Sequence, residues 1–521
     1  MAQDAAAETA ARSIVKHSPV SGERLGEFPM ADAAAVEQAV CRARAAFPGW
    51  RALGLERRLE ALERLRPVIL EHGEDYARRI SDDTGKPLVD SLLTELMAIP
   101  LFVSHYRKLA PKLFERQKVA TPMIFPGKKS YLEYFPMGVI GIIAPWNFPF
   151  QLSMVPMISA LIGGNTVVLK PSEVTPLTGE LVRELFAAID LAAGVVEVVQ
   201  GDGATGAALV AADIDKVFFT GSVVTGRKVM AAAAEKPIPV ELELGGKDAM
   251  IVLADAHLER AARAAVWGGL MNAGQMCTSV ERILVEDAVH DRFVELLQRE
   301  VDRVRLGGPE DDADMGPITF TPQLETVAAH IAQAREAGAR VLTGGGRREG
   351  PGQFFQPTVL AGVTPEMDIY RHETFGPVLP VIRVADADEA VRLANDHIYG
   401  LTGSVFSGDA KRGLEIASRL ECGQVMVNDL VVSVGNPALP FGGVKASGFG
   451  RYHGAEGLLT FMHQKAIMVD KGKHSDEPFW FPYRGKYADV LAAFQLLLRG
   501  KLVSALGPLK RLRKKNRQAD S

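Results

Sequence analysis

The run Gly138-Val-Ile-Gly-Ile-Ile-Ala144 is short, apolar and continuous, and it opens the stretch of the chain that decides the fold. Three further short runs rich in β-branched or aromatic residues follow, at 166–169, 195–199 and 216–219. Helix-like stretches separate the runs, at 152–161, 177–191, 204–212 and 226–235. Buried strands that alternate with helices are typical of a parallel, doubly wound sheet. We therefore predict an α/β fold whose first sheet begins at this run.

A second alternating series follows Glu243-Leu-Gly-Gly-Lys247 and predicts a second Rossmann-like sheet. Its strands are expected at 249–253, 283–285, 340–342, 378–384, 404–406 and 424–427. Ahead of both series, helices are expected at 32–47 and 55–79, the first with Asp32 as its N-cap and Pro48-Gly49 as its stop. Residues 1–30 are polar and are expected to form an arm.

The composition is that of a globular protein, with 47% hydrophobic and 23% charged residues over 521 positions, enough for two or three domains. A net charge of -4 gives no indication of nucleic-acid binding. Cys41, Cys277 and Cys422 are few and far apart, so a reducing, cytoplasmic setting is expected rather than a disulfide framework. The start lacks the pattern of a signal peptide, and no apolar run reaches the ~18 residues of a membrane span.

One cysteine stands in a loop of small and polar residues, Asn272-Ala-Gly-Gln-Met-Cys-Thr-Ser279. An amphipathic segment precedes this loop and a strand-like run, 282–285, follows it. A thiol at such a junction can be exposed and deprotonated, as a nucleophile requires. The alternative is that Cys277 is a small buried apolar residue.

Three glycine-bearing sites compete to hold a dinucleotide. Gly201-Asp-Gly-Ala-Thr-Gly206 matches G-x-G-x-x-G after a strand, but no acid ends the next strand. Phe219-Thr-Gly-Ser-Val-Val-Thr-Gly226 lies where a strand turns into a helix, so its backbone N–H groups and the Ser222 hydroxyl could face a pyrophosphate. Gly245-Gly246 is the third site. We favour the second for phosphate and treat the first as a packing turn or a neighbour of the adenine.

Lys170-Pro-Ser-Glu173 ends a buried strand, and ligands bind at the carboxyl ends of strands in open α/β sheets. Lys170 and Glu173 could both reach a ribose, whose hydroxyls would donate to the carboxylate. Because Glu173 would repel a 2′-phosphate, NAD is preferred and NADP is the less favoured cofactor. The alternative is a surface turn with a solvated ion pair.

Seven motifs together resemble the NAD(P)-dependent aldehyde dehydrogenase superfamily over roughly residues 15–470, in the family's order and at about its spacings. They are Pro145-Trp-Asn-Phe-Pro149, Lys170-Pro-Ser-Glu173, Phe219-Thr-Gly-Ser222, Glu243-Leu-Gly-Gly-Lys247, Gly274-Gln-Met-Cys-Thr278, Glu373-Thr-Phe-Gly-Pro377 and Pro440-Phe-Gly-Gly-Val444. The resemblance implies oxidation of an aldehyde to a carboxylic acid.

By this resemblance Cys277 would be the nucleophile, and the Asn147 side chain and the Cys277 N–H would form an oxyanion hole. Glu243 would activate water to hydrolyse the thioester. The implied cofactor-binding residues are Ala144, Pro145, Trp146, Lys170, Ser172, Glu173, Phe219, Thr220, Gly221, Ser222, Gly226, Leu244, Gly245, Glu373 and Phe375. The expected substrate pocket is Phe148, Leu152, Val155, Met276, Thr278 and Phe441, with Val431 and Val432 as further apolar candidates. We expect no metal site.

Two positions depart from the family's pattern. Pro156 stands where some members have a lysine, and Tyr452 where many have an acid, so proton-exit routes that use those groups are in doubt. The residues around 149–157 and Tyr452-His-Gly454 resemble the class 3 and fatty aldehyde branch. The long N-terminal helical region and Gly448-Phe-Gly-Arg451 resemble the generic branch instead.

The expected organisation has four parts. An NAD-binding domain would span 1–117 and 137–245, a catalytic domain 246–457, a β-arm 118–136 and 458–470, and a basic, partly amphipathic tail 471–521. In the family the arm pairs with another subunit, so a homodimer or homotetramer is implied. The tail ends in Lys510-Arg-Leu-Arg-Lys-Lys-Asn-Arg517 and is either a solvated segment or a peripheral contact with anionic lipid.

The substrate is expected to be an apolar aliphatic or aromatic aldehyde, long-chain if the tail meets a membrane. A semialdehyde such as succinic semialdehyde is the alternative, although no arginine is placed to hold its carboxylate. Two other readings stay open: a CoA-acylating or phosphorylating relative, and a non-enzymatic binding or structural protein on this fold.

Overall fold

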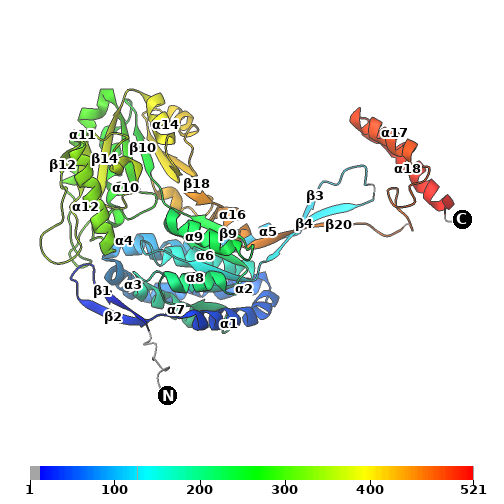
Figure 1. Cartoon of the computed structure of the whole chain (residues 1–521), viewed down its shortest axis with the longest axis horizontal. Helices are drawn as coiled ribbons and strands as arrows, with labels where there is room; N and C mark the ends of the chain where they lie inside the picture. Colours follow the sequence, from blue (N-terminus) through cyan, green and yellow to red (C-terminus); the bar gives the residue numbers. More distant parts are fainter. Residues whose placement is uncertain (1–11, 126, 474, 520–521) are drawn as a thin grey trace, which may run out of the picture. The chain divides into compact units, whose positions relative to one another are not determined.

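The computed structural model describes residues 12–125, 127–473 and 475–519, with side chains up to Leu512. Two compact units form it: Met1–Pro111 with Pro136–Met462, and Lys112–Phe135 with His463–Ser521 (Figure 1). The larger unit holds both predicted α/β sheets, so the predicted fold class is confirmed.

The first sheet has six strands in the order β19-β9-β8-β5-β6-β7. They are β5 (Val139–Ile143), β6 (Thr166–Lys170), β7 (Val196–Val198), β8 (Lys216–Thr220), β9 (Val240–Glu243) and β19 (Gly448–Phe449). All neighbours pair in parallel except β19, which is antiparallel to β9. The intervening helices are α6 (Gln151–Gly163), α7 (Pro176–Ala188), α8 (Gly203–Ala211) and α9 (Val223–Ala234). Each lies within a few residues of its predicted span.

Both faces of this sheet are covered by apolar side chains. Val139 and Ile143 of β5 belong to a cluster with residues of α8, α9 and α1 (Ala33–Ala52). Ile140 and Ile142, which alternate with them, are also fully buried. Continuous burial along a strand is what a parallel sheet between two helical layers requires.

The second sheet has seven strands in the order β12-β13-β14-β11-β10-β16-β17. They are β10 (Asp248–Val252), β11 (Val280–Glu286), β12 (Arg340–Thr343), β13 (Thr358–Ala361), β14 (Val378–Val384), β16 (Thr402–Phe406) and β17 (Gln424–Val427). Only β13 was not expected from the sequence. The helices and short turns between Lys247 and Thr460 are α10 (Leu258–Leu270), η2 (Met271–Gly274), α11 (Asp287–Val301), α12 (Thr321–Glu336), α13 (Asp368–Arg371), α14 (Ala387–Asn395), α15 (Ala410–Ala417), η3 (Val432–Gly435) and α16 (Gly454–Leu459). A small pair, β15 (Tyr399–Gly400) and β18 (Val444–Lys445), is antiparallel.

A four-residue connector, Leu244 to Lys247, joins the two sheets. It runs from the carboxyl end of β9 to the amino end of β10. Asp248 pairs with Val280 at the start of β11, so the loop that precedes β11 lies at the same amino edge. The carboxyl edge of the first sheet is thereby joined directly to the amino edge of the second.

The N-terminal region differs from the sequence expectation in its first strands and in the length of its first helix. Residues 13–29 are not a featureless arm, because β1 (Ser13–His17) and β2 (Arg24–Pro29) form an antiparallel hairpin. Helix α1 does begin after its predicted N-cap Asp32, but it continues through Pro48 to Ala52. The buried Trp50 donates from Nε1 to Leu161 O (3.1 Å), and this tertiary contact holds the turn beyond the proline.

The predicted helix 55–79 is two helices, α2 (Leu55–Glu63) and α3 (Leu65–Thr84). They are followed by α4 (Leu88–Asp90), the π-helix η1 (Ser91–Leu96) and α5 (Ala98–Leu113). Within the described residues, the stretch Leu88–Leu113 is long and apolar enough to cross a membrane by length and composition, a feature that we did not expect from the sequence. Its most apolar window is 39% buried inside the protein.

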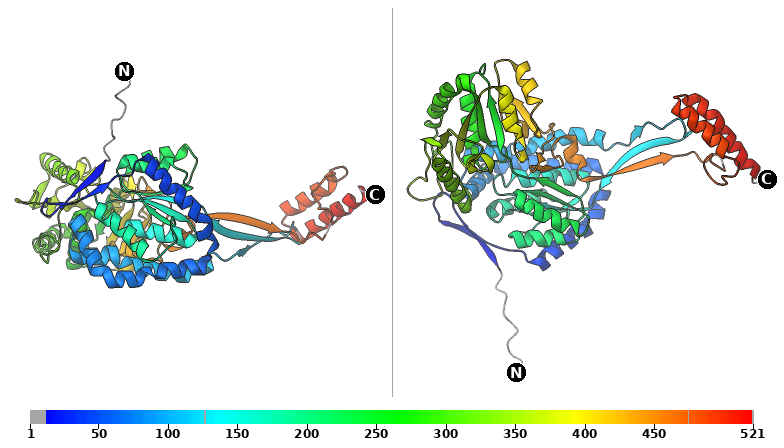
Figure 2. Two further views of the ribbon diagram at one scale, coloured as in Figure 1. Left: turned by 90° about the horizontal axis from the view of Figure 1, so that it is seen from below. Right: turned by 45° about the horizontal axis from the view of Figure 1, so that its top comes forward.

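The smaller unit combines a sheet and a helical hairpin. Strands β3 (Gln117–Val119), β4 (Lys129–Pro136) and β20 (Met462–Val469) form a sheet in the order β20-β4-β3. Helices α17 (Tyr487–Leu498) and α18 (Leu502–Ala519) lie side by side (Figures 1 and 2). Of the basic run 510–517, the side chains beyond Leu512 lie outside the described residues.

Candidate active site

Four predicted site residues stand at one edge of the first sheet. In the strand register Ile143 lies opposite both Lys170 and Phe219, and Thr220 lies opposite Glu243. Ala144 follows directly after β5. Parallel pairing thus brings together four motifs that are widely spaced in the sequence, because their strands all end at the same edge.

The loop that carries Cys277 connects η2 to β11. Asn272 and Ala273 have positive φ values of 51° and 56°, an unusual conformation that tertiary contacts must hold. Gln275 is fully buried: its Oε1 accepts from Thr319 N (2.8 Å) and its Nε2 donates to Asn272 O (2.8 Å). The loop is therefore fixed from two sides before it reaches the cysteine.

Asn147 is tied to this same loop. Its Nδ2 donates to Gln275 O (3.1 Å), and its own carbonyl accepts from Asn272 Nδ2 (2.8 Å). One amide hydrogen of Asn147 is thereby engaged with the loop of Cys277. The structure brings these two predicted residues onto adjoining segments.

A buried ion pair supports the Asn147 segment. Lys86 Nζ donates to Glu95 Oε1 (2.7 Å) and to Asn147 O (3.0 Å), and neither charged side chain is exposed. Glu95 Oε2 in turn accepts from Phe150 N and Gln151 N at the start of α6. Sequence reasoning missed this pair. The signal that could have indicated it is an acid, Glu95, inside an otherwise apolar helical stretch.

Glu243, at the end of β9, is buried, and both of its carboxylate oxygens lack a hydrogen-bond partner within the part of the chain that is described. Burial raises the pKa of Glu243 well above its usual value, and the nearby charge of Glu241 raises it further, while Arg451 acts in the opposite direction. A carboxyl group that has a raised pKa, and whose two oxygens have no hydrogen-bond partner among the described residues, is suited to accept and release a proton.

The Cys277 side chain is half-buried. Burial raises the pKa of the Cys277 thiol, and the charges of Asp248, Glu373 and Glu243 add to this effect. The thiol is therefore held in its protonated form in the free protein, and a base must accept its proton before it attacks.

The loop with Glu373 and Phe375 closes one side of the site. Gly246 N donates to Glu373 Oε1 (3.0 Å), and a Cβ on Gly245 would lie 2.2 Å from Glu373 Oε2. Burial raises the pKa of Glu373 to about 8, chiefly by removing its carboxylate from water. Trp146 meets the Phe375 ring edge-on, with ring centroids 5.4 Å apart.

A second buried ion pair orients this loop. Lys247 Nζ lies 2.5 Å from Glu281 Oε2, and the two Glu281 oxygens accept from Thr374 N (2.7 Å) and Phe375 N (2.8 Å). The role of Glu281 was not apparent from the sequence, because its partners come from two distant segments.

The far end of the predicted cofactor site has an ion pair and a helix N-terminus. Lys170 Nζ lies 2.9 Å from Glu173 Oε2, and the carboxylate side is 43% exposed. Ser222 is the N-cap of α9 and accepts from Thr225 N (3.3 Å). Thr220 Oγ1 is buried and has no partner among the described residues. Further along α9, Gly226 packs against Leu244.

These features fit a dinucleotide. An exposed helix N-terminus offers backbone donors to a pyrophosphate. The Lys170–Glu173 pair offers a donor and an acceptor to ribose hydroxyls, and the free Thr220 oxygen can accept or donate. Ser172, Pro145 and Gly221 lie in the loops at these strand ends, and Phe219 lies near the end of β8.

Phe148, Leu152, Val155, Met276, Thr278 and Phe441 are buried, as is Val431, whereas the further candidate Val432 is 50% exposed. Phe148 packs beneath Lys86, with Nζ 4.2 Å from the ring centroid. Phe441 meets the Tyr452 ring edge-on at 5.3 Å. Thr278 and Val431 line a small cavity together with Met426 and Leu430. Leu152, Val155 and Met276 are buried, and Val155 has no exposed surface, so a substrate could reach Val155 only after neighbouring side chains move.

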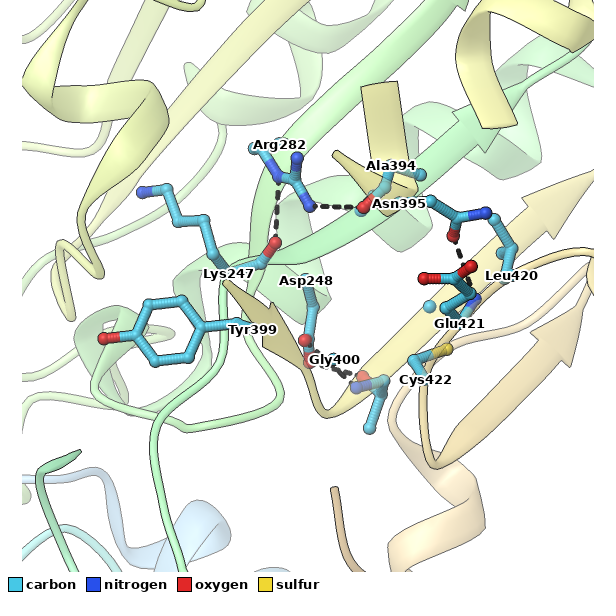
Figure 3. A pocket seen from close by; sticks show the side chains of 13 residues that line it. Lys247, Asp248, Arg282, Ala394, Asn395, Tyr399, Gly400, Leu420, Glu421 and Cys422 are labelled. Atoms are coloured by element: carbon cyan, nitrogen blue, oxygen red, sulfur yellow. Dashed lines mark hydrogen bonds between the residues drawn. The ribbon is translucent and has the colours of Figure 1, made fainter. Parts of the chain in front are cut away.

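A separate cavity lies beside the connector. It is lined by Lys247, Asp248, Arg282, Tyr399 and Cys422 among others, and Figure 3 shows Arg282 held by the backbone carbonyls of Lys247 and Ala394. Cys277, Asn147 and Glu243 do not line this cavity.

Comparisons with known proteins identify the family. The model of the aldehyde dehydrogenase family matches residues 6–467. The chain belongs to this family. A Methylomonas protein named 4,4'-diapolycopene aldehyde oxidase is 42% identical over 90% of this chain and 88% of its own length. A Mycolicibacterium smegmatis protein, provisionally named a succinate-semialdehyde dehydrogenase with NADP(+), is 37% identical over 88% of this chain and 89% of its own.

Solved aldehyde dehydrogenases share the fold. The Mycobacterium tuberculosis enzyme, solved as a complex with NAD+, is 36% identical and superposes with a TM-score of 0.85 over 89% of this chain and 96% of its own. The NAD+ complex of the Bacillus cereus enzyme is also 36% identical, with a TM-score of 0.84 over 88% and 94%. The predicted membership is confirmed, while the branch within the family stays a prediction.

We expect Lys86→Met to lower the free energy of unfolding by about 3–5 kcal/mol, because Glu95 would be left buried and uncompensated. Urea unfolding followed by circular dichroism measures this change. The double variant Lys86→Met/Glu95→Gln removes both charges but keeps an acceptor for Phe150 N and Gln151 N, so it should lose less. Equal losses in the single and double variants would contradict an ion-pair role.

We expect Glu241→Gln to move the acid limb of the pH profile of kcat to lower pH. Removing a neighbouring negative charge lowers the pKa of Glu243, so Glu243 stays deprotonated at lower pH. Glu241 is paired with the buried Lys216 (3.0 Å), so Lys216→Met/Glu241→Gln is the control. The control removes opposite charges together and should shift the limb less. A limb that moves to higher pH in Glu241→Gln would rule out this electrostatic coupling.

Proposed function

We propose that this aldehyde dehydrogenase oxidises an apolar aldehyde to its carboxylic acid with NAD, through a thioester on Cys277. One observation carries the proposal. Asn147 is hydrogen-bonded to the loop of Cys277, and Glu243 lies near enough to act on the pKa of the thiol, with two buried oxygens that have no hydrogen-bond partner among the described residues. A nucleophile, an oxyanion donor and a base are the three groups that acyl transfer to water requires.

The residues would act in sequence. Cys277 loses its proton to a base and its sulfur bonds to the aldehyde carbon, giving a thiohemiacetal whose oxygen is stabilised by Asn147 Nδ2 and Cys277 N–H. NAD, held by the residues at the strand ends, would supply the hydride acceptor for this oxidation, so that the acyl group would remain on Cys277 as a thioester. Glu243 then takes a proton from water, whose oxygen bonds to the acyl carbon. The C–S bond breaks, and the acid and the free thiol are released.

The cofactor would be held by the residues predicted for it. Lys170 and Glu173 would bind the adenosine ribose, the N-terminus of α9 the pyrophosphate, and Glu373 the nicotinamide-side ribose. A negative Glu173 disfavours a 2′-phosphate, which supports NAD over NADP. Relatives point both ways: two neighbours were solved with NAD+, whereas several succinate-semialdehyde relatives are named for NADP(+) and one solved neighbour is described as NADP dependent.

An apolar substrate is favoured by the side chains around the site. Phe148, Leu152, Met276 and Phe441 carry no charge, and the buried Lys86 over the Phe148 ring is already paired with Glu95. A semialdehyde would need a cation for its carboxylate. The Methylomonas relative's name, which refers to a hydrocarbon-derived aldehyde, agrees with an apolar substrate, and the succinate-semialdehyde relatives keep that alternative in view.

The remaining proposals concern organisation. The first α/β sheet and its helices would bind NAD, residues 246–457 would supply the nucleophile, and the sheet β20-β4-β3 would pair with a second subunit in a dimer or tetramer. We place the enzyme in the cytoplasm, with peripheral membrane contact through residues 471–521.

Assays of NADH formation test the reaction and its substrate. We expect kcat/KM to rise from hexanal to decanal and to be at least about tenfold lower with succinic semialdehyde, because Phe148, Leu152, Met276 and Phe441 offer apolar surface to a chain and no charge to a carboxylate. Cys277→Ala should abolish NADH formation with every aldehyde. A preference for succinic semialdehyde would overturn the apolar assignment, and stimulation by added CoA would indicate an acyl acceptor other than water.

Cofactor choice is tested at Glu173. We expect Glu173→Ser to raise the ratio of kcat/KM with NADP+ to that with NAD+ by about tenfold, because a repelling charge is removed. Glu235→Ser, which removes an exposed acid just beyond the C-terminus of α9, is the matched control. If Glu173→Ser leaves the ratio unchanged, Glu173 does not select the cofactor.

A further inference from the structure

The helical hairpin of the smaller unit has an unusual distribution of polarity. On α17 the residues Tyr487, Leu491, Phe494 and Leu498 follow one another at helical spacing, and all four are exposed, Leu498 to 73%. Asp489 of the same helix is buried instead. A helix of a water-soluble protein normally turns its apolar stripe inward. Here the stripe, which we call the α17 stripe, faces outward.

The inward side of the hairpin explains why the stripe is left outside. Ala493, Leu509 and Leu512 form a small core, and Arg511 Nε of α18 donates to Asp489 Oδ1 (2.7 Å). This apolar core and the Asp489–Arg511 ion pair hold the two helices together. The stripe is therefore not needed for the packing of the hairpin itself.

An aromatic turn precedes α17 and extends the exposed apolar surface. Trp480, Phe481 and Tyr483 are exposed, Phe481 to 79%. Lys486 Nζ donates to the carbonyls of Pro478 (3.3 Å) and Trp480, so the turn is fixed although its rings are exposed. Leu502 and Val503 at the start of α18 are exposed as well. Exposed apolar residues that gather in one such region of the chain indicate an interaction site.

The charge of this part of the chain indicates what covers the surface. Residues 471–521 contain twelve Lys and Arg and four Asp and Glu, a net charge of +8 in a chain whose total is -4. A second copy of the same hairpin would carry the same positive charge and would be repelled, whereas an anionic lipid surface is complementary. Trp and Tyr beside an apolar stripe are the residues that favour the interface between headgroups and acyl chains.

We propose that the α17–α18 hairpin and the turn 478–483 dock on a lipid bilayer that contains anionic headgroups. The α17 stripe and the aromatic rings enter the interface, and the exposed side chains of Arg499, Lys501 and Lys510 contact the headgroups. The docking stands independently of the catalytic assignment. Its role, the capture of aldehydes dissolved in the bilayer, rests on the proposed function.

Vesicle flotation of the full-length protein tests the docking. We expect the protein to float with phosphatidylcholine–phosphatidylglycerol vesicles, and to float less with pure phosphatidylcholine vesicles or at high salt. Phe494→Gln/Leu498→Gln should lower the partition coefficient by about tenfold or more, because both changes remove apolar surface from the interface. Lys501→Glu/Lys510→Glu should weaken flotation with the anionic vesicles only.

The matched control is Leu70→Gln/Leu414→Gln, which replaces two exposed leucines outside the hairpin and should float as the wild type does. Flotation of the stripe variant at wild-type strength, or no flotation of the wild type, overturns the proposal. The proposal would also be overturned if neither the wild type nor the stripe variant bound vesicles and light scattering gave the two proteins different molar masses. The stripe would then mediate self-association.

NADH formation with hexanal separates this proposal from the proposed function. Hexanal is water-soluble, so the stripe variant should oxidise it at the wild-type rate, which also shows that the variant folds. Docking without any hexanal oxidation by the wild type would leave the docking intact and overturn the proposed function. Hexanal oxidation by the wild type without vesicle docking would leave the proposed function intact and overturn the docking proposal.

Discussion

The four-residue connector between the two sheets is the constraint on which the site depends. A Cβ on Gly246 would lie 2.4 Å from Cys277 O, and Gly246 N donates to Glu373 Oε1. The connector follows directly after Glu243 and ends at Lys247, whose ammonium group orients the Glu373 loop through Glu281. One short segment thus touches the backbone of the proposed nucleophile, the carboxylate proposed for the ribose and the proposed base. It can do so only because no side chain stands between them.

Buried lysine–glutamate pairs hold the segments that meet at this connector. Lys86–Glu95 fixes the turn with Asn147, Lys247–Glu281 fixes the turn with Phe375, and Lys216–Glu241 lies in the first sheet beside Glu243. Each pair also binds backbone groups or hydroxyls. Such pairs add little net stability compared with apolar packing, since both charges must leave water. These pairs act here by orienting the segments they bind, because an ion pair that makes further hydrogen bonds fixes the orientation of a segment as well as its position.

Local signals made much of the fold predictable from the sequence. Short apolar runs such as Val139–Ile143 and the Asp32 cap were read correctly, because strand burial and capping depend on neighbouring residues. The motifs also placed Cys277, Asn147 and Glu243 in one family pattern. The expected stop at Pro48 was wrong because Trp50 is held by Leu161, and the expected arm at the N-terminus was wrong because Lys16 bonds to Val174 O.

The sequence could not predict the buried pairs around the site. Lys86 and Glu95 look like ordinary charged residues until folding brings Asn147 above them. Glu281 could not be linked to a loop more than ninety positions away, because that contact exists only after β11 pairs with β14. Likewise, α17 is apolar in sequence, but only the structure shows that its stripe faces outward while Asp489 faces inward.

The tight approach of Gly246 to Cys277 has a consequence for motion. Many two-domain enzymes capture substrate by closing a hinge between their domains. A hinge placed at Leu244–Lys247 would carry Glu243 and Cys277 apart with every opening, since the connector touches both partners. Substrate entry should therefore proceed with the two sheets fixed relative to one another, through rearrangement of side chains such as those around Val155. We therefore expect the side chains that line the site, and not the connector, to move when a substrate enters.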